Sequence, residues 1–220
     1  MPKAFTAQEK ELIRRRLLEQ GYKQFSTYGL PKTNIEELAE AVGISKGAFY
    51  LFYASKEALF MEVIEQIEQG FRQELLAMVD LPGPSPRARL FAVLQQAFRL
   101  FRTLPLLRFL TGNDYDLLFR RMPPERWQEH FASDRMFLEE LISRCQNAGI
   151  PIRVQTEEII SLLYPLVPTI LHEDDFGAFR LGGGVNVFLE LVAAFCLGEI
   201  ELQLQPPGNP PPSPEEGDSR

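Results

Sequence analysis

The stretch that decides the fold reads TNIEELAEAVGISKGAFYLFYASK and covers residues 33–56. Thr33 is followed three residues later by Glu36, which is the pattern of a capping box, so we predict Thr33 as the N-cap of a helix over 34–42. Apolar residues recur along this helix at spacings of 3, 4 and 7 and give it one apolar face. The stretch therefore opens with a short amphipathic helix.

A turn and a second helix follow directly. Gly43 supplies the tight turn, and Ser45 is predicted to cap a helix over about 46–53. Two short helices joined by such a glycine-containing turn describe a helix-turn-helix, whose second helix enters the DNA major groove. Spacing alone leaves a helical hairpin inside an all-α core as the alternative.

The residue types of the second helix favour DNA binding over a core hairpin. Gly47 and Ala48 lie in its first turn, where bulky side chains would hold the backbone away from DNA. Lys46 and Lys56 bracket the helix with positive charge. Tyr50 offers a hydroxyl on a flat ring, which can pack while its oxygen reaches a phosphate.

The run GISKGAFYLFYASKEAL, residues 43–59, resembles the signature of TetR-type transcriptional regulators. The usual signature has a tyrosine in the recognition helix, an aromatic residue three positions on, and Lys-Glu-x-Leu at the start of the next helix. Tyr50, Tyr53 and the residues KEAL fill these positions, and Tyr53 stands where phenylalanine is more usual.

The resemblance implies an all-α protein of about nine helices in two domains. Residues 1–54 would form a three-helix DNA-binding domain that contains the helix-turn-helix, and residues 55–205 a helical ligand-binding and dimerisation domain. The Pro-rich segment 206–220 cannot bury a core and is expected to be a disordered tail.

Local signals set the helix boundaries that we predict. Thr6 and Glu9 form another capping-box pattern, which begins a helix that Gly29 ends after Tyr28. A helix over 56–79 is predicted to connect the two domains. Further helices are predicted over 86–103, 105–112, 114–122, 125–147, 156–171 and 185–204.

The charge of the chain is unevenly distributed. The net charge is −7, but residues 1–56 hold nine Lys/Arg against six Asp/Glu, a net of +3, and residues 57–220 hold 14 against 24, a net of −10. A basic amino-terminal part and an acidic body suit a DNA-binding protein with a separate sensing domain. No apolar run reaches the roughly 18–20 residues that span a bilayer, and no signal-peptide core is present, so we expect a cytoplasmic protein without a membrane partner.

The sequence offers no reaction centre. It contains two His and two Cys without metal-ligand spacing, and it has no G-x-S-x-G motif and no phosphate loop. We therefore predict that the chain is not an enzyme and has neither a cofactor nor a metal site.

Candidate DNA contacts follow from the helix-turn-helix. The residues predicted to reach phosphates are Thr33, Ser45, Lys46, Tyr50 and Lys56. Gly47, Ala48 and Phe49 lie where the backbone can approach bases, with Phe49 as a core residue in the alternative. Leu51 and Phe52 occupy positions at which the family often places contact residues, and Leu51 could read a thymine methyl group.

The body supplies residues for a ligand pocket, which the resemblance implies. An aromatic lining with a few polar groups would suit a largely apolar effector with one anionic or hydrogen-bonding end, such as an acyl or aromatic carboxylate derivative. The candidates are Phe98, Phe101, Arg102, Phe109, Asn113, Phe119, Trp127, Phe131 and Tyr164. The alternative is that the aromatic residues are core and the arginine is solvated.

Dimerisation through the last two helices is also implied by the resemblance. Their wide apolar surfaces permit a four-helix bundle with a second copy, and a buried hairpin within one chain is the alternative. The candidate interface residues are Ile160, Leu163, Val167, Phe188, Leu191, Val192 and Phe195.

These expectations together predict a homodimeric repressor that binds a palindromic operator in double-stranded DNA and is released by a small molecule. Two half-sites are needed because one short helix contacts few base pairs. The alternative functions are a DNA-binding regulator controlled by a protein partner rather than a small molecule, and an activator.

Overall fold

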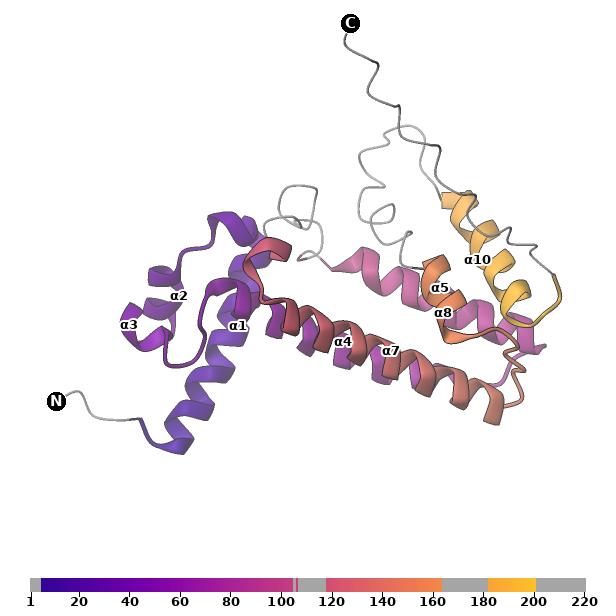
Figure 1. Ribbon diagram of the computed structural model, residues 1–220, viewed down its shortest axis with the longest axis horizontal. Coiled ribbons are helices and arrows are strands. Elements are labelled where there is room, and N and C mark those ends of the chain that lie inside the picture. Colours follow the sequence, from indigo (N-terminus) through magenta and orange to yellow (C-terminus); the bar gives the residue numbers. More distant parts are fainter. Residues whose placement is uncertain (1–4, 105, 107–117, 164–181, 201–220) are drawn as a thin grey trace, which may run out of the picture.

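The computed structural model describes residues 5–104, 106, 118–163 and 182–200, and the regular elements in these ranges are helices. The all-α fold class is confirmed. The helices are α1 (Ala7–Lys32), α2 (Ile35–Ala41), α3 (Lys46–Phe49), α4 (Lys56–Val79), α5 (Pro86–Thr103), α7 (Pro124–Asn147), α8 (Thr156–Leu163) and α10 (Gly182–Cys196). Helices α1 to α3 gather at one end of an elongated molecule, and α4 runs from them into the body (Figure 1).

Helix α1 begins and breaks at the predicted residues. The Thr6 hydroxyl accepts from the Glu9 amide at 3.2 Å, and the Glu9 carboxylate accepts from the Thr6 amide at 2.7 Å, which completes the capping box. At Gly29 the backbone leaves the helical conformation with φ 75°. One further turn then carries the chain to Lys32.

The predicted cap of the next helix is wrong. Asn34, not Thr33, caps α2, because the Asn34 side chain accepts from the Glu36 amide at 2.8 Å. The Thr33 hydroxyl donates instead to the Gly29 carbonyl at 2.8 Å and is buried. Thr33 thereby ties the break in α1 to the start of α2.

The second helix of the motif is shorter than predicted. Ser45 caps α3 as expected, with its hydroxyl 3.2 Å from the Ala48 amide, but α3 ends at Phe49 rather than near 53. The amides of Leu51 and Phe52 bond to carbonyls three residues back, at 3.1 and 2.9 Å. These bonds tighten the backbone into a turn that leads to the start of α4.

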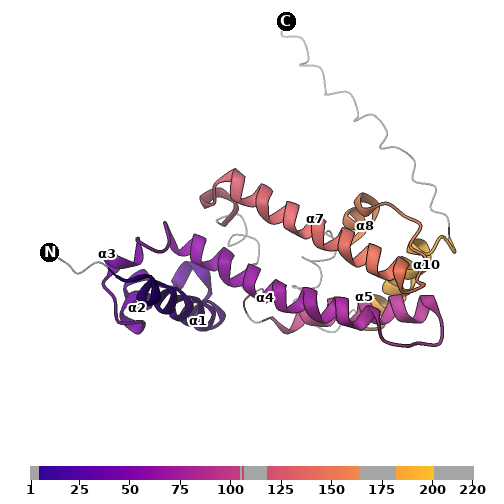
Figure 2. The ribbon, with the colours of Figure 1, turned by 90° about the horizontal axis from the view of Figure 1, so that it is seen from below.

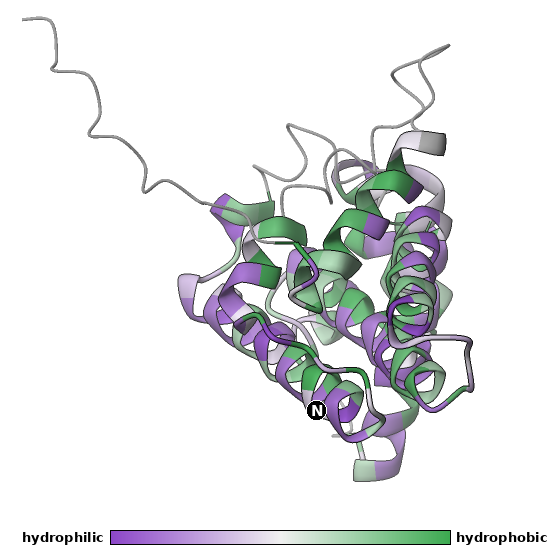
Figure 3. Ribbon diagram, turned by 90° about the vertical axis from the view of Figure 1, so that its right-hand side faces the viewer, coloured by the Kyte–Doolittle hydropathy of each residue, from purple (hydrophilic) through white to green (hydrophobic). Residues whose placement is uncertain are grey.

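Two apolar clusters hold the described residues together, and α4 contributes to both. Leu59 and Phe60 of α4 lie in the cluster that includes α1, α2 and α3. Leu75 and Val79, at the other end of α4, lie in the cluster with α5, α7, α8 and α10. Figure 2 shows α4 passing from the amino-terminal helices to the body, with α7 alongside it. In Figure 3, which views the body end, hydrophobic residues lie mainly where helices face one another.

The helices of the body match the predictions over 86–103 and 125–147 closely. The last helix ends at Cys196 rather than at 204, because Gly198 adopts φ 68° and the Glu199 amide bonds back to the Ala194 carbonyl at 2.9 Å. Most of the helices predicted over 105–112 and 114–122, the second half of 156–171 and the tail 206–220 lie outside the described residues. The boundary between residues 1–54 and 55–205 stays a prediction.

No helix in the described ranges is both long and apolar enough to cross a membrane.

Candidate nucleic-acid interface

The turn between α2 and α3 depends on Gly43. Its φ of 78° lies in the left-handed region that residues with a Cβ rarely adopt. The Gly43 and Ile44 amides bond back to the Glu40 and Ala39 carbonyls, both at 3.0 Å, and close the turn. Ser45 is thus placed as the cap of α3, and the geometry is that of a helix-turn-helix.

Phe49 anchors α3 from beneath. Its side chain is fully buried, and its ring centroid lies 5.7 Å from that of Tyr50 and 5.9 Å from that of Tyr53. The alternative assignment of Phe49 to the core is therefore the one that the structure shows. Phe52 is half-buried with its ring 5.9 Å from Phe5, so this predicted contact residue is engaged in packing instead.

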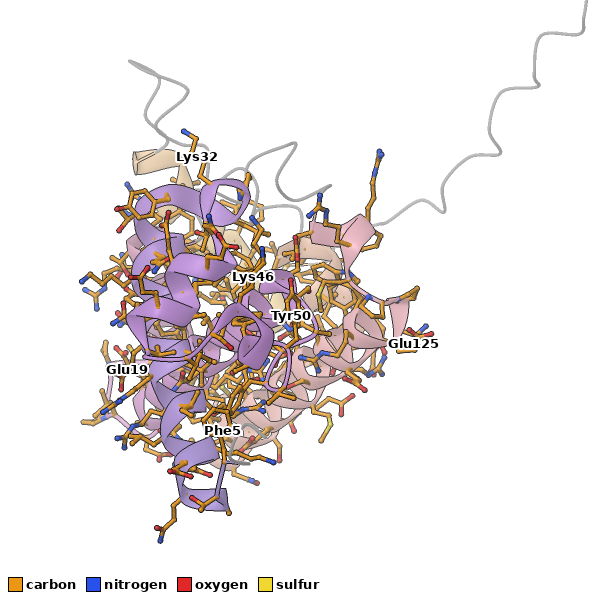
Figure 4. All side chains as sticks on the ribbon, turned by 90° about the vertical axis from the view of Figure 1, so that its left-hand side faces the viewer. Phe5, Glu19, Lys32, Lys46, Tyr50 and Glu125 are labelled. Atoms are coloured by element: carbon orange, nitrogen blue, oxygen red, sulfur yellow. The ribbon has the colours of Figure 1, made fainter. Side chains whose placement is uncertain are left out.

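The opposite surface of α3 and the turn after it is exposed. Ser45, Lys46, Gly47 and Tyr50 are exposed, and Leu51 keeps 71% of its surface. Figure 4 shows Lys46 and Tyr50 on the outward side of the amino-terminal helices. An apolar side chain as exposed as Leu51, beside a lysine and a tyrosine, suits contact with another molecule. We call these five residues the α3 face. Ala48, the other predicted contact here, is half-buried.

Lys46 already has an acidic partner on the same surface. Its ammonium donates to the Glu36 carboxylate at 2.9 Å, and this hydrogen bond raises the pKa of Lys46. Both side chains are more than half exposed, so breaking this ion pair costs little free energy. Lys46 is therefore charged and able to exchange Glu36 for a phosphate.

Two predicted phosphate contacts are corrected. Thr33 is buried, and its hydroxyl donates a hydrogen bond to the Gly29 carbonyl. The Lys56 ammonium donates to the carbonyls of Pro31 and Thr33 at 2.9 and 2.8 Å, and burial lowers the pKa of Lys56. Lys56 therefore holds the end of α1 against the start of α4, and neither residue belongs to the α3 face.

One exposed cation near the motif was missed in the sequence. Lys32 lies at the end of α1, directly before the segment that leads into α2 (Figure 4). Lys32 could have been recognised from its position in the last helical turn before the motif, where a basic side chain is exposed to solvent. Lys32 is a further candidate for phosphate contact.

Three of the predicted pocket residues come together in the body. The Trp127 ring lies 5.2 Å from Phe119 and 5.7 Å from Phe131, and Trp127 is buried between them. Phe98 and Phe101 are half-buried on α5, and the Arg102 guanidinium lies 5.9 Å above the Phe98 ring. The remaining candidates, Phe109, Asn113 and Tyr164, lie outside the described residues.

Two surface hollows among the described residues lie away from these aromatic residues. One hollow lies along the first turns of α1, and the other lies between α1 and α4 beside Tyr22 and Ile67. The ligand pocket of the body therefore stays a prediction.

The dimer prediction is partly corrected. Val192 keeps only 3% of its surface and Phe195 is also buried, so both are covered by their own chain and not offered to a partner. Leu191 keeps 51% and Val187, one turn before it, is also exposed. Ile160, Leu163 and Phe188 are half-buried, and Val167 lies outside the described residues.

The sequence of the motif matches a known family. A family model described as bacterial regulatory proteins, tetR family, matches residues 17–63, which contain the second half of α1, the helix-turn-helix and the first turns of α4. Residues 17–63 therefore carry the DNA-binding motif of the TetR family.

Curated transcriptional regulators match part of the chain. The chain is 35% identical over 88 residues to the uncharacterized HTH-type transcriptional regulator YerO of Bacillus subtilis, a match that covers 40% of this chain and 30% of YerO. It spans between 26% and 44% of the length of the first curated relatives that it matches.

Solved structures of the TetR family share the fold over most of the chain. A TetR/AcrR-family transcriptional regulator of Thermobifida fusca aligns with a TM-score of 0.57 and 23% identity over 82% of this chain and 96% of its own. The TetR-family repressor FadR of Thermus thermophilus, solved in complex with lauroyl-CoA, aligns with a TM-score of 0.60 and 22% identity over 90% of this chain and 100% of its own. These matches are to transcriptional regulators rather than enzymes, as predicted.

Proposed function

We propose that this chain is a homodimeric repressor of the TetR family that binds a palindromic operator through the α3 face and is released by a largely apolar small molecule. The observation that carries the proposal is the α3 face itself. Ser45, Lys46, Gly47, Tyr50 and Leu51 stay exposed while the buried Phe49 fixes the helix behind them.

Each residue of the α3 face has a part in DNA binding. Lys46, Ser45 and Tyr50 supply donors for phosphate oxygens and set the register of the helix. Gly47 has no side chain, and a Cβ there would meet only the Ser45 hydroxyl at 3.9 Å, so the backbone is open to close approach. Leu51 has no hydrogen-bonding group and would contact thymine methyl groups in the major groove.

A dimer is needed because α3 is only four residues long and contacts few base pairs. Val187 and Leu191 form an exposed apolar strip on α10, on the side away from the buried Val192. A second copy would cover this strip together with the half-buried Ile160 and Leu163 of α8. Leu191→Glu should therefore convert the dimer to a monomer in light scattering without unfolding it, while Val187→Ala should weaken the dimer less.

Release by a ligand would act through α4. Because α4 belongs to the apolar clusters at both ends, a ligand that binds one body geometry better than another also biases the position of the helix-turn-helix. An acyl or aromatic carboxylate derivative is supported by the aromatic group around Trp127 and by the lauroyl-CoA bound to the similarly folded FadR.

The test is selection from a pool of random duplexes at near-physiological salt, followed by sequencing of the retained DNA. An inverted repeat is the expected result. Leu51→Ala should lose sequence preference, whereas Leu81→Ala, which removes another exposed leucine outside the α3 face, should not. A folded dimer that enriches no sequence, both as purified and after unfolding, stripping and refolding, would contradict the proposal. Titration of the bound complex with acyl-CoA and aromatic acids then tests release.

A further inference from the structure

Three potential metal ligands meet at the seam between α4 and α7. Glu68 comes from the middle of α4, and His130 and Asp134 lie one turn apart on α7. The His130 Nδ1 atom lies 3.9 Å from the Glu68 Oε2 atom, and the His130 Nε2 atom lies 3.7 Å from the Asp134 Oδ2 atom. One ligand atom from each residue fits within 4.8 Å of the other two.

Two of these groups are buried without a hydrogen bond among the described residues. The Glu68 Oε2 and His130 Nδ1 atoms have no partner there, although the side chains keep only 19% and 11% of their surface. A buried acceptor or donor without a partner costs about 1–3 kcal/mol, so native structures seldom leave two of them facing one another. The two atoms therefore face one another without a protein hydrogen bond, as neighbouring ligands of one metal ion would.

The surrounding charges leave room for a cation. Asp134 uses its Oδ1 atom to accept from Arg72 at 2.5 Å, while its Oδ2 atom faces His130. The Arg72 guanidinium also donates to the Ser133 hydroxyl at 2.7 Å and stays 3.8 Å from Glu68. Arg72 therefore orients Asp134, whose Oδ2 atom lies nearest the histidine.

We propose that Glu68, His130 and Asp134 bind a divalent transition-metal cation between α4 and α7. One imidazole and two carboxylates suit Zn²⁺ and its first-row neighbours, whereas Ca²⁺ and Mg²⁺ prefer oxygen ligands alone. Zinc bonds of about 2.0–2.2 Å to nitrogen and oxygen place tetrahedral ligand atoms about 3.4 Å apart, so modest side-chain rotations would close the observed site. Water would complete the coordination.

Such a cation would join α4 to α7 at a point between the helix-turn-helix and the far end of the body. It would add to the existing ion pair along the seam, which links Glu65 of α4 to Arg126 of α7 at 2.9 Å. The site does not rest on the proposed function, because it needs neither DNA nor an organic ligand.

The test uses the full chain without an affinity tag, stripped with a chelator and titrated with Zn²⁺ in competition with a chromophoric chelator. One equivalent per chain should bind. Glu68→Gln, which is nearly isosteric, and His130→Gln should each weaken binding at least about 100-fold while circular dichroism and thermal unfolding show a folded protein. Glu139→Gln is the matched control, because it removes an exposed carboxylate of α7 that is not one of the three ligands, and it should leave the affinity unchanged.

The cobalt complex gives a second readout. Co²⁺ bound at this site should show ligand-field absorption without the charge-transfer bands of thiolate, since the two cysteines are not in the ligand set. The proposal is overturned if the wild-type chain binds less than one equivalent, if Glu68→Gln and His130→Gln bind as tightly as the wild type, or if thiolate bands appear.

Discussion

The amino-terminal helices and the body are built from different kinds of contact. In α1 to α3 the decisive bonds are local: Thr6 with Glu9, Asn34 with Glu36 and Ser45 with Ala48 each join residues two or three positions apart. In the body the polar links join distant segments, as Arg72 joins Asp134 and Arg87 joins Glu190. A helix-turn-helix can therefore be read from a short stretch of sequence, whereas the chemistry of the body depends on which helices pack together.

The largest effect should come from the anchor of α3. Phe49→Ala removes a fully buried ring and should lower the free energy of unfolding by about 3–5 kcal/mol, measured by denaturant titration. The control is Leu51→Ala, two residues on, which should change it by no more than about 0.5 kcal/mol because the side chain is exposed. Equal losses in the two variants would show that the α3 face is not a free surface.

In the body, the buried Glu68 should make stability depend on pH. Its pKa of about 8 in the folded protein, against 4.5 as the ordinary value, means that the folded state keeps a proton that the unfolded chain has lost between these pH values. Stability from this group is therefore complete below about pH 4.5 and falls by up to about 1.4 kcal/mol per pH unit as the pH rises toward 8.

The difference between wild type and Glu68→Gln isolates this contribution, since glutamine does not titrate. In the presence of a chelator, Glu68→Gln should gain stability relative to wild type as the pH rises from 5 to 8, measured by denaturant titration at each pH. Parallel curves for the two proteins would mean that Glu68 is well solvated.

The two glycines of the motif offer a comparison within the amino-terminal helices. Gly43→Ala should cost about 1–2 kcal/mol, because φ of 78° strains a residue with a Cβ even though nothing lies within 4 Å. Gly47→Ala should be neutral or stabilising by up to about 1 kcal/mol, because alanine favours the helix, yet it should weaken DNA binding. Thermal unfolding measures the first effect and fluorescence anisotropy with operator DNA the second. A strongly destabilised Gly47→Ala would contradict this assignment.

The smallest effect on stability should be at Lys46. Its ion pair with Glu36 is exposed and screened by solvent, so Lys46→Ala should unfold almost as the wild type does. DNA affinity should fall about equally for all sequences, and the slope of log affinity against log salt should decrease by about one. A loss confined to one sequence would instead indicate that Lys46 reads a base.

The helix-turn-helix could be predicted from the sequence because its signals are local. The prediction failed where a contact with a residue outside the motif decides which of two suitable residues caps a helix. Thr33 and Asn34 are both good caps, and Asn34 takes the role because the Thr33 hydroxyl bonds to the Gly29 carbonyl. The sequence overestimates the length of α3 because neither glycine nor proline occurs between residues 48 and 53. The end of the helix is set instead by the turn toward α4.

The body was harder to predict from local patterns. Leu191 and Val192 are adjacent apolar residues, and only the packing of α10 on its own chain decides that Val192 is buried while Leu191 is exposed. The cluster of Glu68, His130 and Asp134 has no sequence signal, because His130 lies 62 positions after Glu68 and no spacing rule connects them. Sequence analysis accordingly predicted no metal site.

The most direct test of the account is the ratio of affinities for a selected operator and a scrambled duplex, measured by fluorescence anisotropy at one salt concentration for the wild type and for Leu51→Ala. We predict a wild-type ratio of at least about 10³ and a ratio at least about tenfold lower in Leu51→Ala, with non-specific affinity unchanged. A wild-type ratio near one, or an equal ratio in both proteins, would contradict sequence recognition by the α3 face.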